Sequence, residues 1–146
     1  MVIIMLSLSF ASRANDCQFP ALLHQQRSVA TINILETEWS RAYLRGDTGF
    51  EACLLTADFT EIMRNGDVKH LADELALAAR NTAKPLPIGE LPEAIVLLHG
   101  NVAVAYGRSQ STSGERAMRY ADYYVWENNQ WRAFFAQQTE IDRSRS

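Results

Sequence analysis

The chain has 146 residues, which is the size of one domain with a hydrophobic core of its own. Its apolar content of 47% and charged content of 21% are typical of globular proteins. A net charge of −3 without a basic stripe argues against a nucleic-acid partner. No apolar run reaches the ~20 residues that a helix needs to cross a bilayer, so we expect no membrane contact in the mature form.

The first residues form an apolar leader. Val2–Ala11 has the length of a signal-peptide core, and Ala11 and Ala14 are the small residues that signal peptidase requires. No Lys or Arg precedes the run, which departs from the usual signal peptide. We predict a signal peptide over 1–14, an N-terminal extension over 15–27, and a secreted or periplasmic location. The alternative is a loosely packed leader on a cytoplasmic protein.

Cys17 and Cys53 are the two cysteines of the chain. In an exported protein, a disulfide between them would close a loop of about 35 residues and tie the mature N-terminus to the domain. In a cytoplasmic protein, Cys53 would be a small buried apolar residue. Neither cysteine has metal-ligand spacing, and the three histidines lie far apart in the sequence, so we expect no metal site.

Three helices are predicted in the first half of the chain. Ser28–Arg45 carries apolar residues three and four apart, and Gly46 can end it in a left-handed conformation. A second helix begins at Thr48, which matches a capping box with Glu51. The third helix is predicted over Val68–Arg80.

The remaining elements are predicted to be strands. Asp58–Arg64 is a short strand, and Asn81–Pro92 is a proline-containing loop. Turn signals separate four further strands, at 94–98, 102–112, 116–127 and 131–141. Residues 142–146 are predicted to form a flexible tail. This order predicts an α+β fold with helices gathered on one face of a curved sheet, leaving a conical cavity between the layers.

Three segments carry a resemblance to a known family: ETEWSRAYLRGDTGFEACLLTADF, VLLHGNVAVAYGRS and RYADYYVWENNQWRAFFAQQT. In this order and spacing, they resemble the NTF2-like superfamily, specifically its SnoaL-like and DUF4440 group. The resemblance implies a cone-shaped, cystatin-like fold over 28–141, with three N-terminal helices on a curved antiparallel sheet. It also implies a homodimer paired through the convex sheet face. The superfamily includes isomerases, dehydratases, cyclases and non-catalytic binding subunits, so the fold does not decide the function.

The strand at 116–127 places one acid among large apolar side chains. Its inward-facing residues are predicted from strand alternation to be Met118, Tyr120, Asp122, Tyr124 and Trp126. We expect burial to raise the pKa of Asp122. In the ketosteroid isomerases of the family that the chain resembles, an acid at this place stays protonated and donates a hydrogen bond to an oxyanion. Alternatively, Asp122 pairs with Arg119, Arg108 or a polar group of the first helix and only organises the cavity.

This chain does not retain the other two functional residues of the ketosteroid isomerases. Their helix tyrosine falls on Trp39 and their base aspartate near Met63, and neither side chain can exchange a proton. Tyr43, one turn after Trp39, either reaches the cavity or packs in the core. Glu61 is either an alternative base or a solvent-facing strand residue, and His70 is a second candidate base near the predicted cavity mouth. We therefore do not expect ketosteroid isomerase activity.

The last strand is polar near its end. Alternation puts Gln137 and Thr139 on the side of Trp131 and Phe135, and Gln138 on the other side. One set would line the cavity, and the other would meet a dimer partner.

These residues together predict a protein that binds a moderately apolar small molecule without a cofactor. One alternative is a cofactor-free SnoaL-like isomerase, hydratase or hydrolase, in which Asp122 acts with Glu61 or His70. A second alternative is a structural dimerisation domain with a filled cone. Besides the three catalytic candidates, the predicted ligand-binding residues are Trp39, Tyr43, Met63, Tyr120, Tyr124 and Trp126.

Overall fold

The computed structural model describes residues 17–84, 94–110 and 117–141. The predicted signal peptide at 1–14 and the predicted tail at 142–146 lie outside these residues. In the part of the chain that is described, no helix is both long and apolar enough to cross a membrane.

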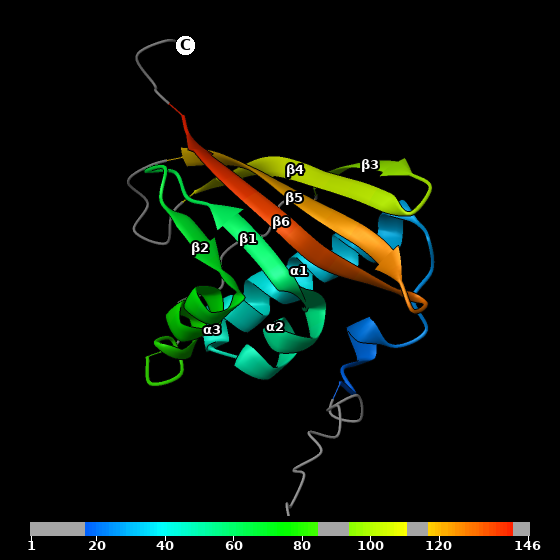
Figure 1. The fold of residues 1–146 in the computed structure, drawn as a ribbon, viewed down its shortest axis with the longest axis horizontal. Coiled ribbons are helices and arrows are strands. Elements are labelled where there is room, and N and C mark those ends of the chain that lie inside the picture. The colour runs from blue at the N-terminus through cyan, green and yellow to red at the C-terminus, as the bar shows by residue number, and fades with distance from the viewer. Residues whose placement is uncertain (1–16, 85–93, 111–116, 142–146) are drawn as a thin grey trace, which may run out of the picture.

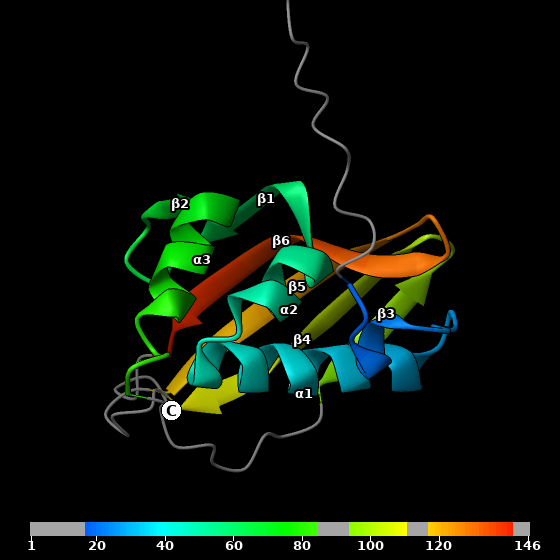
Figure 2. The same cartoon turned by 90° about the horizontal axis from the view of Figure 1, so that it is seen from below.

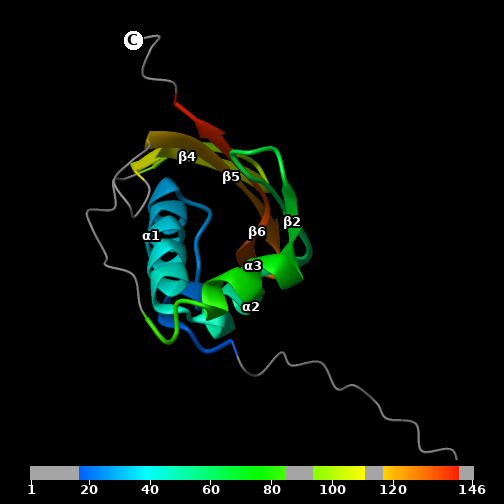
Figure 3. The ribbon, with the colours of Figure 1, turned by 90° about the vertical axis from the view of Figure 1, so that its left-hand side faces the viewer.

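The described elements form one six-stranded sheet with helices on one side (Figure 1). The strand order is β2-β1-β6-β5-β4-β3, and β1 runs parallel to β6 while every other pair is antiparallel. The helices lie on the concave side of the sheet (Figures 2 and 3), as expected for the α+β prediction. In chain order the elements are the 3-10 helix η1 (Pro20–Leu22), α1 (Val29–Arg45), α2 (Thr48–Leu54), β1 (Leu55–Ile62), β2 (Val68–His70), α3 (Leu71–Ala79), β3 (Ile95–His99), β4 (Val102–Gln110), β5 (Ala117–Glu127) and β6 (Gln130–Glu140).

Helix α1 has the ends that its sequence predicts. The Ser28 side chain accepts a hydrogen bond from the Thr31 amide, which satisfies one free donor of the first turn. Gly46 follows the last turn with a φ of 75°. A Cβ atom at Gly46 would lie 2.5 Å from the backbone nitrogen of Thr82, so a side chain is excluded by close approach as well as by conformation.

The second helix begins at Thr48 as predicted, but the predicted capping residue is wrong. Asp47, and not Thr48, caps α2, because its carboxylate accepts the Phe50 amide at 3.1 Å. The capping box between Thr48 and Glu51 does not form. Glu51 instead turns towards the protein interior and has no exposed surface.

The predicted third helix also begins too early. Val68–His70 forms the short strand β2, which pairs with β1, and α3 starts only at Leu71. His70 is the N-cap of α3, and its amide donates to Asp73 at 3.0 Å. Pairing with a neighbouring strand therefore overrides the helical pattern at these three residues.

A β-bulge interrupts the pairing of β5 with β6. Tyr123 stands opposite Phe135, but the next residue, Tyr124, stands opposite Ala133. Phe134 is therefore an extra residue of β6 in this register. Both Phe134 and Phe135 meet Tyr123 edge to face, with ring centroids 6.3 and 5.5 Å apart.

The bulge reverses which residues of β6 face the helices. Trp131, before the bulge, is fully buried, and so is Ala136 after it. Gln138 continues the inward side, whereas Gln137 and Thr139 are exposed. The simple alternation that grouped Gln137 and Thr139 with Trp131 is therefore wrong, because the extra residue shifts the phase of the strand.

The N-terminal segment is fixed to the helical layer. A disulfide joins Cys17 to Cys53, with the two Cα atoms 5.7 Å apart. Phe19 packs edge to face against Phe50 with a centroid distance of 5.3 Å, and Leu22 is buried in the core. The segment before α1 is thus part of the folded unit.

Candidate functional site

Strand β5 turns Tyr120, Asp122 and Tyr124 towards the helices, as its alternation predicts. Tyr124 is fully buried, and Tyr120 packs against the core from the same face. Asp122 and Tyr120 keep partial exposure although they face the helices.

Helix α1 brings a second carboxyl group to Asp122. The carboxyl groups of Glu36 and Asp122 share a hydrogen bond. The Tyr124 hydroxyl donates to Oε1 of Glu36 at 2.5 Å. Arg119 and Arg108, the other partners considered for Asp122, are exposed. The partner of Asp122 is therefore a polar group of the first helix.

The closeness of the two carboxyl groups disfavours a negative charge on both of them at once. Burial raises the pKa of Glu36 from 4.5 to about 7, although hydrogen bonds from Tyr124 and Asp122 oppose the rise. Burial, with the charge of Glu36 as a further cause, raises the pKa of Asp122 well above its usual range. Two close carboxyl groups in an apolar setting hold one proton between them near neutral pH. This pair, Glu36 and Asp122, is called the carboxyl pair below.

A pair that holds one proton near pH 7 can donate or accept a proton, or bind a polar ligand group. The sequence interpretation missed Glu36. Its position nevertheless carries a signal, because Glu36 lies three residues before Trp39 and seven before Tyr43 on one helix. A charged residue on that stripe faces the sheet.

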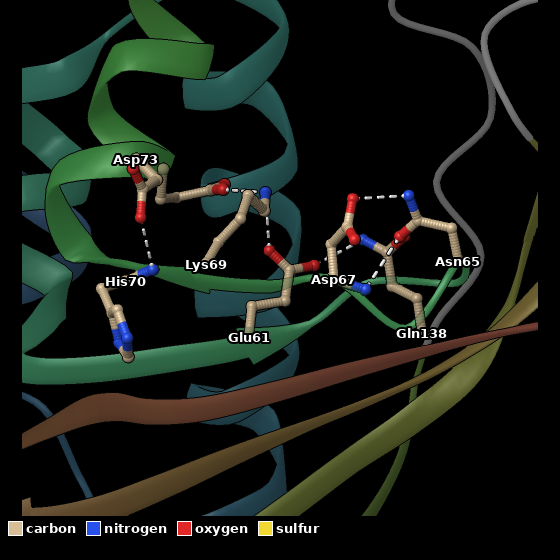
Figure 4. A network of polar contacts seen from close by, with 8 residues as sticks. Glu61, Asn65, Asp67, Lys69, His70, Asp73 and Gln138 are labelled. Atoms are coloured by element: carbon tan, nitrogen blue, oxygen red, sulfur yellow. Dashed lines mark hydrogen bonds and ion pairs between the residues drawn. The ribbon is translucent and has the colours of Figure 1, made fainter.

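A second polar group lies further along the concave face (Figure 4). The Lys69 ammonium contacts Oε2 of Glu61 at 2.8 Å and Oε2 of Glu74 at 2.5 Å. The Gln138 side-chain amide donates to Oε1 of Glu61 at 2.6 Å. Glu61 is only 5% exposed, so it is not a solvent-facing residue. Both of its oxygens are engaged, which makes it a poor free base. Glu61, Lys69 and Glu74 are called the lysine cluster below.

Glu51 lies next to the lysine cluster without a hydrogen bond. It is 0% exposed, and neither of its carboxyl oxygens has a hydrogen-bond partner among the described residues. Burial raises its pKa to about 8, and the negative charge of Glu74 adds to the rise. Burial also raises the pKa of Tyr43, which shares these neighbours.

His70 is not brought to the carboxyl pair. Its ring is exposed, and Nδ1 lies 3.2 Å from the Thr60 hydroxyl. Thr60 precedes Glu61 on β1 and therefore points to the opposite face of the strand. Figure 4 shows the His70 ring apart from the Lys69 contacts. The candidate base His70 thus lies away from Asp122.

The remaining predicted ligand-binding residues have structural contacts. Trp39 packs edge to face on Phe59 at 5.8 Å. Trp126 packs on Trp131 at 5.3 Å. The backbone nitrogen of Met63 donates to a turn carbonyl, and its side chain is partly exposed. Of the predicted set, Tyr124 donates a hydrogen bond to Glu36, and Tyr120 interacts electrostatically with both Glu36 and Asp122.

Two surface hollows are lined by described residues, and both lie away from the carboxyl pair. One, of about 390 Å³, lies between the N-terminal segment and helices α1 and α2. The other, of about 460 Å³, lies on the outer face over β1, β4, β5 and β6. Among the described residues, no group of three or more acidic, His or Cys side chains is arranged to hold a metal ion.

No family model matches the sequence, and no curated protein matches it. Solved structures do match. An NTF2-like protein from Cytophaga hutchinsonii has a TM-score of 0.60 at 19% identity, over 74% of this chain and 95% of that one. A protein of unknown function in the DUF3225 family, from Pectobacterium atrosepticum, has a TM-score of 0.63 at 17% identity, over 85% and 98%.

A third structure, from Parabacteroides distasonis, is provisionally named a ketosteroid isomerase. It has a TM-score of 0.58 at 14% identity, over 77% of this chain and 90% of that one. A cystatin-like fold is also named for a matching protein from Burkholderia xenovorans. At such identities, the likeness is one of fold.

Proposed function

We propose that this chain, whose fold is the NTF2-like, cystatin-like fold, binds a small molecule on the concave face of its sheet. The carboxyl pair carries the proposal, because two buried carboxyl groups that share a proton are costly unless they serve a function. Asp122 and Tyr120 are partly exposed, so a ligand that reaches them would contact the pair directly. Tyr120 and the exposed part of Trp39 would supply moderately apolar contacts, and no cofactor is needed.

A fragment screen observed by NMR tests this proposal. We expect hits to shift amide resonances of β5 and α1, and to weaken in Asp122→Asn and Glu36→Gln. Asp58→Asn is the matched control, because Asp58 is exposed on β1. If no fragment shifts these resonances, or if the hits bind Asp122→Asn as well as the original chain, the proposal is wrong.

Catalysis is a second candidate function, because the carboxyl pair can exchange a proton near pH 7. The reaction would be a cofactor-free isomerisation, hydration or hydrolysis of the SnoaL-like or DUF4440 kind. Asp122 would act with Glu36 in place of Glu61 or His70, since Glu61 is engaged by Lys69 and His70 is exposed. Turnover of a substrate panel that survives both Asp122→Asn and Glu36→Gln would exclude this mechanism.

A homodimer through the convex sheet face is part of the proposal. Strand pairing aligns Leu97, Val104, Tyr123 and Phe135 in one row across β3, β4, β5 and β6. The row is apolar, and Leu97 is 48% exposed. The other three residues are half-buried, and a partly exposed apolar row on a sheet is typical of an interface between protein chains. Dimerisation alone, without ligand binding, remains the structural alternative.

We also propose that the protein is secreted or periplasmic. The Cys17–Cys53 disulfide supports this location, because such bonds persist in oxidising compartments. In a cytoplasmic protein, both thiols would be reduced. Mass spectrometry of the exported protein tests the location, the cleavage of the leader and the disulfide together.

A further inference from the structure

Negative charge exceeds positive charge where α2, α3, β1 and β2 meet. Lys69 supplies one ammonium group, and it is already bonded to Glu61 and Glu74. Glu51 adds a third carboxyl group to the same neighbourhood. If every group is ionised, three negative charges face one positive charge. The group is one positive charge short even after Glu51 takes up a proton.

Glu51 is the member of this neighbourhood that no described residue satisfies. It is fully buried, and both carboxyl oxygens lack a hydrogen-bond partner in the described structure. Buried polar atoms in native proteins are nearly always paired, so an orphan of this kind calls for a partner that the described residues do not supply. The titratable or charged groups that face Glu51 are Glu74 from α3, Lys69 from β2, Glu61 from β1, Asp47 from the start of α2 and Tyr43 from α1.

The chemistry of these groups selects the kind of partner. An anion would meet three carboxyl groups, and a neutral molecule would give an ionised Glu51 no positive charge to pair with. The described residues present no arrangement that could hold a metal ion. A primary ammonium group brings one positive charge and three N–H donors on a compact centre, so it can donate to carboxyl groups of more than one residue.

We infer that the concave interior binds an organic cation of the primary amine class, whose ammonium group donates to Glu51 and Glu74. This inference rests on the proposed binding function and names its ligand class. The free oxygens of Glu51 would accept hydrogen bonds from the ammonium group. Glu74 would contact both Lys69 and the ligand. The rest of the ligand would extend towards the carboxyl pair, since Asp122 interacts electrostatically with both Glu61 and Glu74.

Amine binding should be linked to the proton of Glu51. A cation favours the ionised carboxylate, so binding would release the proton that burial holds on Glu51 at neutral pH. The affinity for an amine should therefore rise about tenfold from pH 6 to pH 7. A neutral analogue should show no such rise.

Three probes of one shape test the inference: benzylamine, benzyl alcohol and benzoate. Binding is followed by NMR titration and calorimetry at pH 6 and pH 7, with the full mature chain. We expect benzylamine to bind more tightly than the other two, with proton release detected by comparing buffers of different ionisation enthalpy. In Glu51→Gln, which keeps the size and removes the ionisable group, benzylamine affinity should fall about tenfold or more and the proton release should disappear.

Glu38→Gln is the matched control, because Glu38 lies on the outer side in an exposed pair with Arg41. It should bind benzylamine like the original chain. Equal or tighter binding of benzyl alcohol or benzoate, undiminished benzylamine binding by Glu51→Gln, or no benzylamine binding at all would overturn the inference. Binding of benzyl alcohol or of screen fragments that weakens in Asp122→Asn would leave the proposed function intact, whereas absence of binding by every probe and fragment would remove both.

Discussion

Replacing Glu51 by glutamine should make the protein more stable at neutral pH. Glu51 is fully buried and has no hydrogen-bond partner in the described structure, and burial raises its pKa from 4.5 to about 8. At pH 7 the unfolded chain carries an ionised Glu51, whereas the folded chain holds it protonated. Folding must therefore take up a proton, and glutamine, which resembles the protonated carboxyl in size and charge, removes that requirement.

The size of the effect follows from the two pKa values. Folding binds the extra proton between about pH 4.5 and pH 8, so this group lowers stability as the pH rises through that window. Near pH 4 the group is protonated in both states, and the variant should gain almost nothing. At pH 7 the proton uptake costs about 3 kcal/mol, since each pH step above 4.5 adds about 1.4 kcal/mol. Glu51→Gln should recover most of that amount.

Urea unfolding at pH 4, 5, 6, 7 and 8 measures the gain directly. Glu38→Gln serves as the control, because the Glu38 side chain is 36% exposed and its surface ion pair with Arg41 should change stability by less than about 1 kcal/mol. A gain that does not depend on pH would contradict the assigned protonation of Glu51. A loss of stability at pH 7 would show that the carboxylate is ionised and satisfied.

Three further changes give separate tests. Tyr124→Phe removes a hydrogen bond to Glu36, so the pKa of Glu36, measured by carboxyl-carbon NMR titration, should rise further. The free energy of unfolding, measured in urea, should fall by about 1–3 kcal/mol. Cys17→Ser with Cys53→Ser opens a loop with a sequence separation of 36, and the stability measured by unfolding under oxidising conditions should fall by about 4 kcal/mol. Tyr123→Lys places a charge in the apolar row on the convex face. If the proposed homodimer forms, sedimentation should show a dimer for the original chain and a monomer for this variant.

Each of these tests has a result that contradicts its reasoning. An unchanged Glu36 pKa in Tyr124→Phe would mean that the hydroxyl does not donate to that carboxylate. Equal stability of the cysteine variant would mean that the bond does not form in solution. A dimer that survives Tyr123→Lys would place the interface elsewhere.

Local signals explain why much of the fold was predictable. Ser28 and Gly46 mark the ends of α1, and each forms the cap expected of its residue type. Asn128 and Asn129 both adopt positive φ angles, as a two-residue hairpin turn requires. These features depend on a few neighbouring residues, so the sequence alone contains them.

Features that depend on distant partners were not predictable. Val68–His70 continues the pattern of α3, and only its pairing with β1 makes it a strand. The extra residue of β6 is Phe134, which is neither a glycine nor a proline and so does not indicate a bulge. Burial of Glu36 and Glu51 likewise follows from packing between elements, whereas glutamate in a helix is usually exposed. The candidate site therefore rests on Asp122, which the sequence singles out, and on Glu36, which it does not.

The parallel pairing of β1 with β6 makes the last strand the link between two parts of the sheet. β2 and β1 reach β5, β4 and β3 only through β6. During synthesis the residues of β1 emerge about 75 positions before those of β6. The N-terminal strands therefore cannot join the rest of the sheet until β6 has been made. A truncation before Gln130 would separate the strands of the lysine cluster from the strand of the carboxyl pair as well as removing β6.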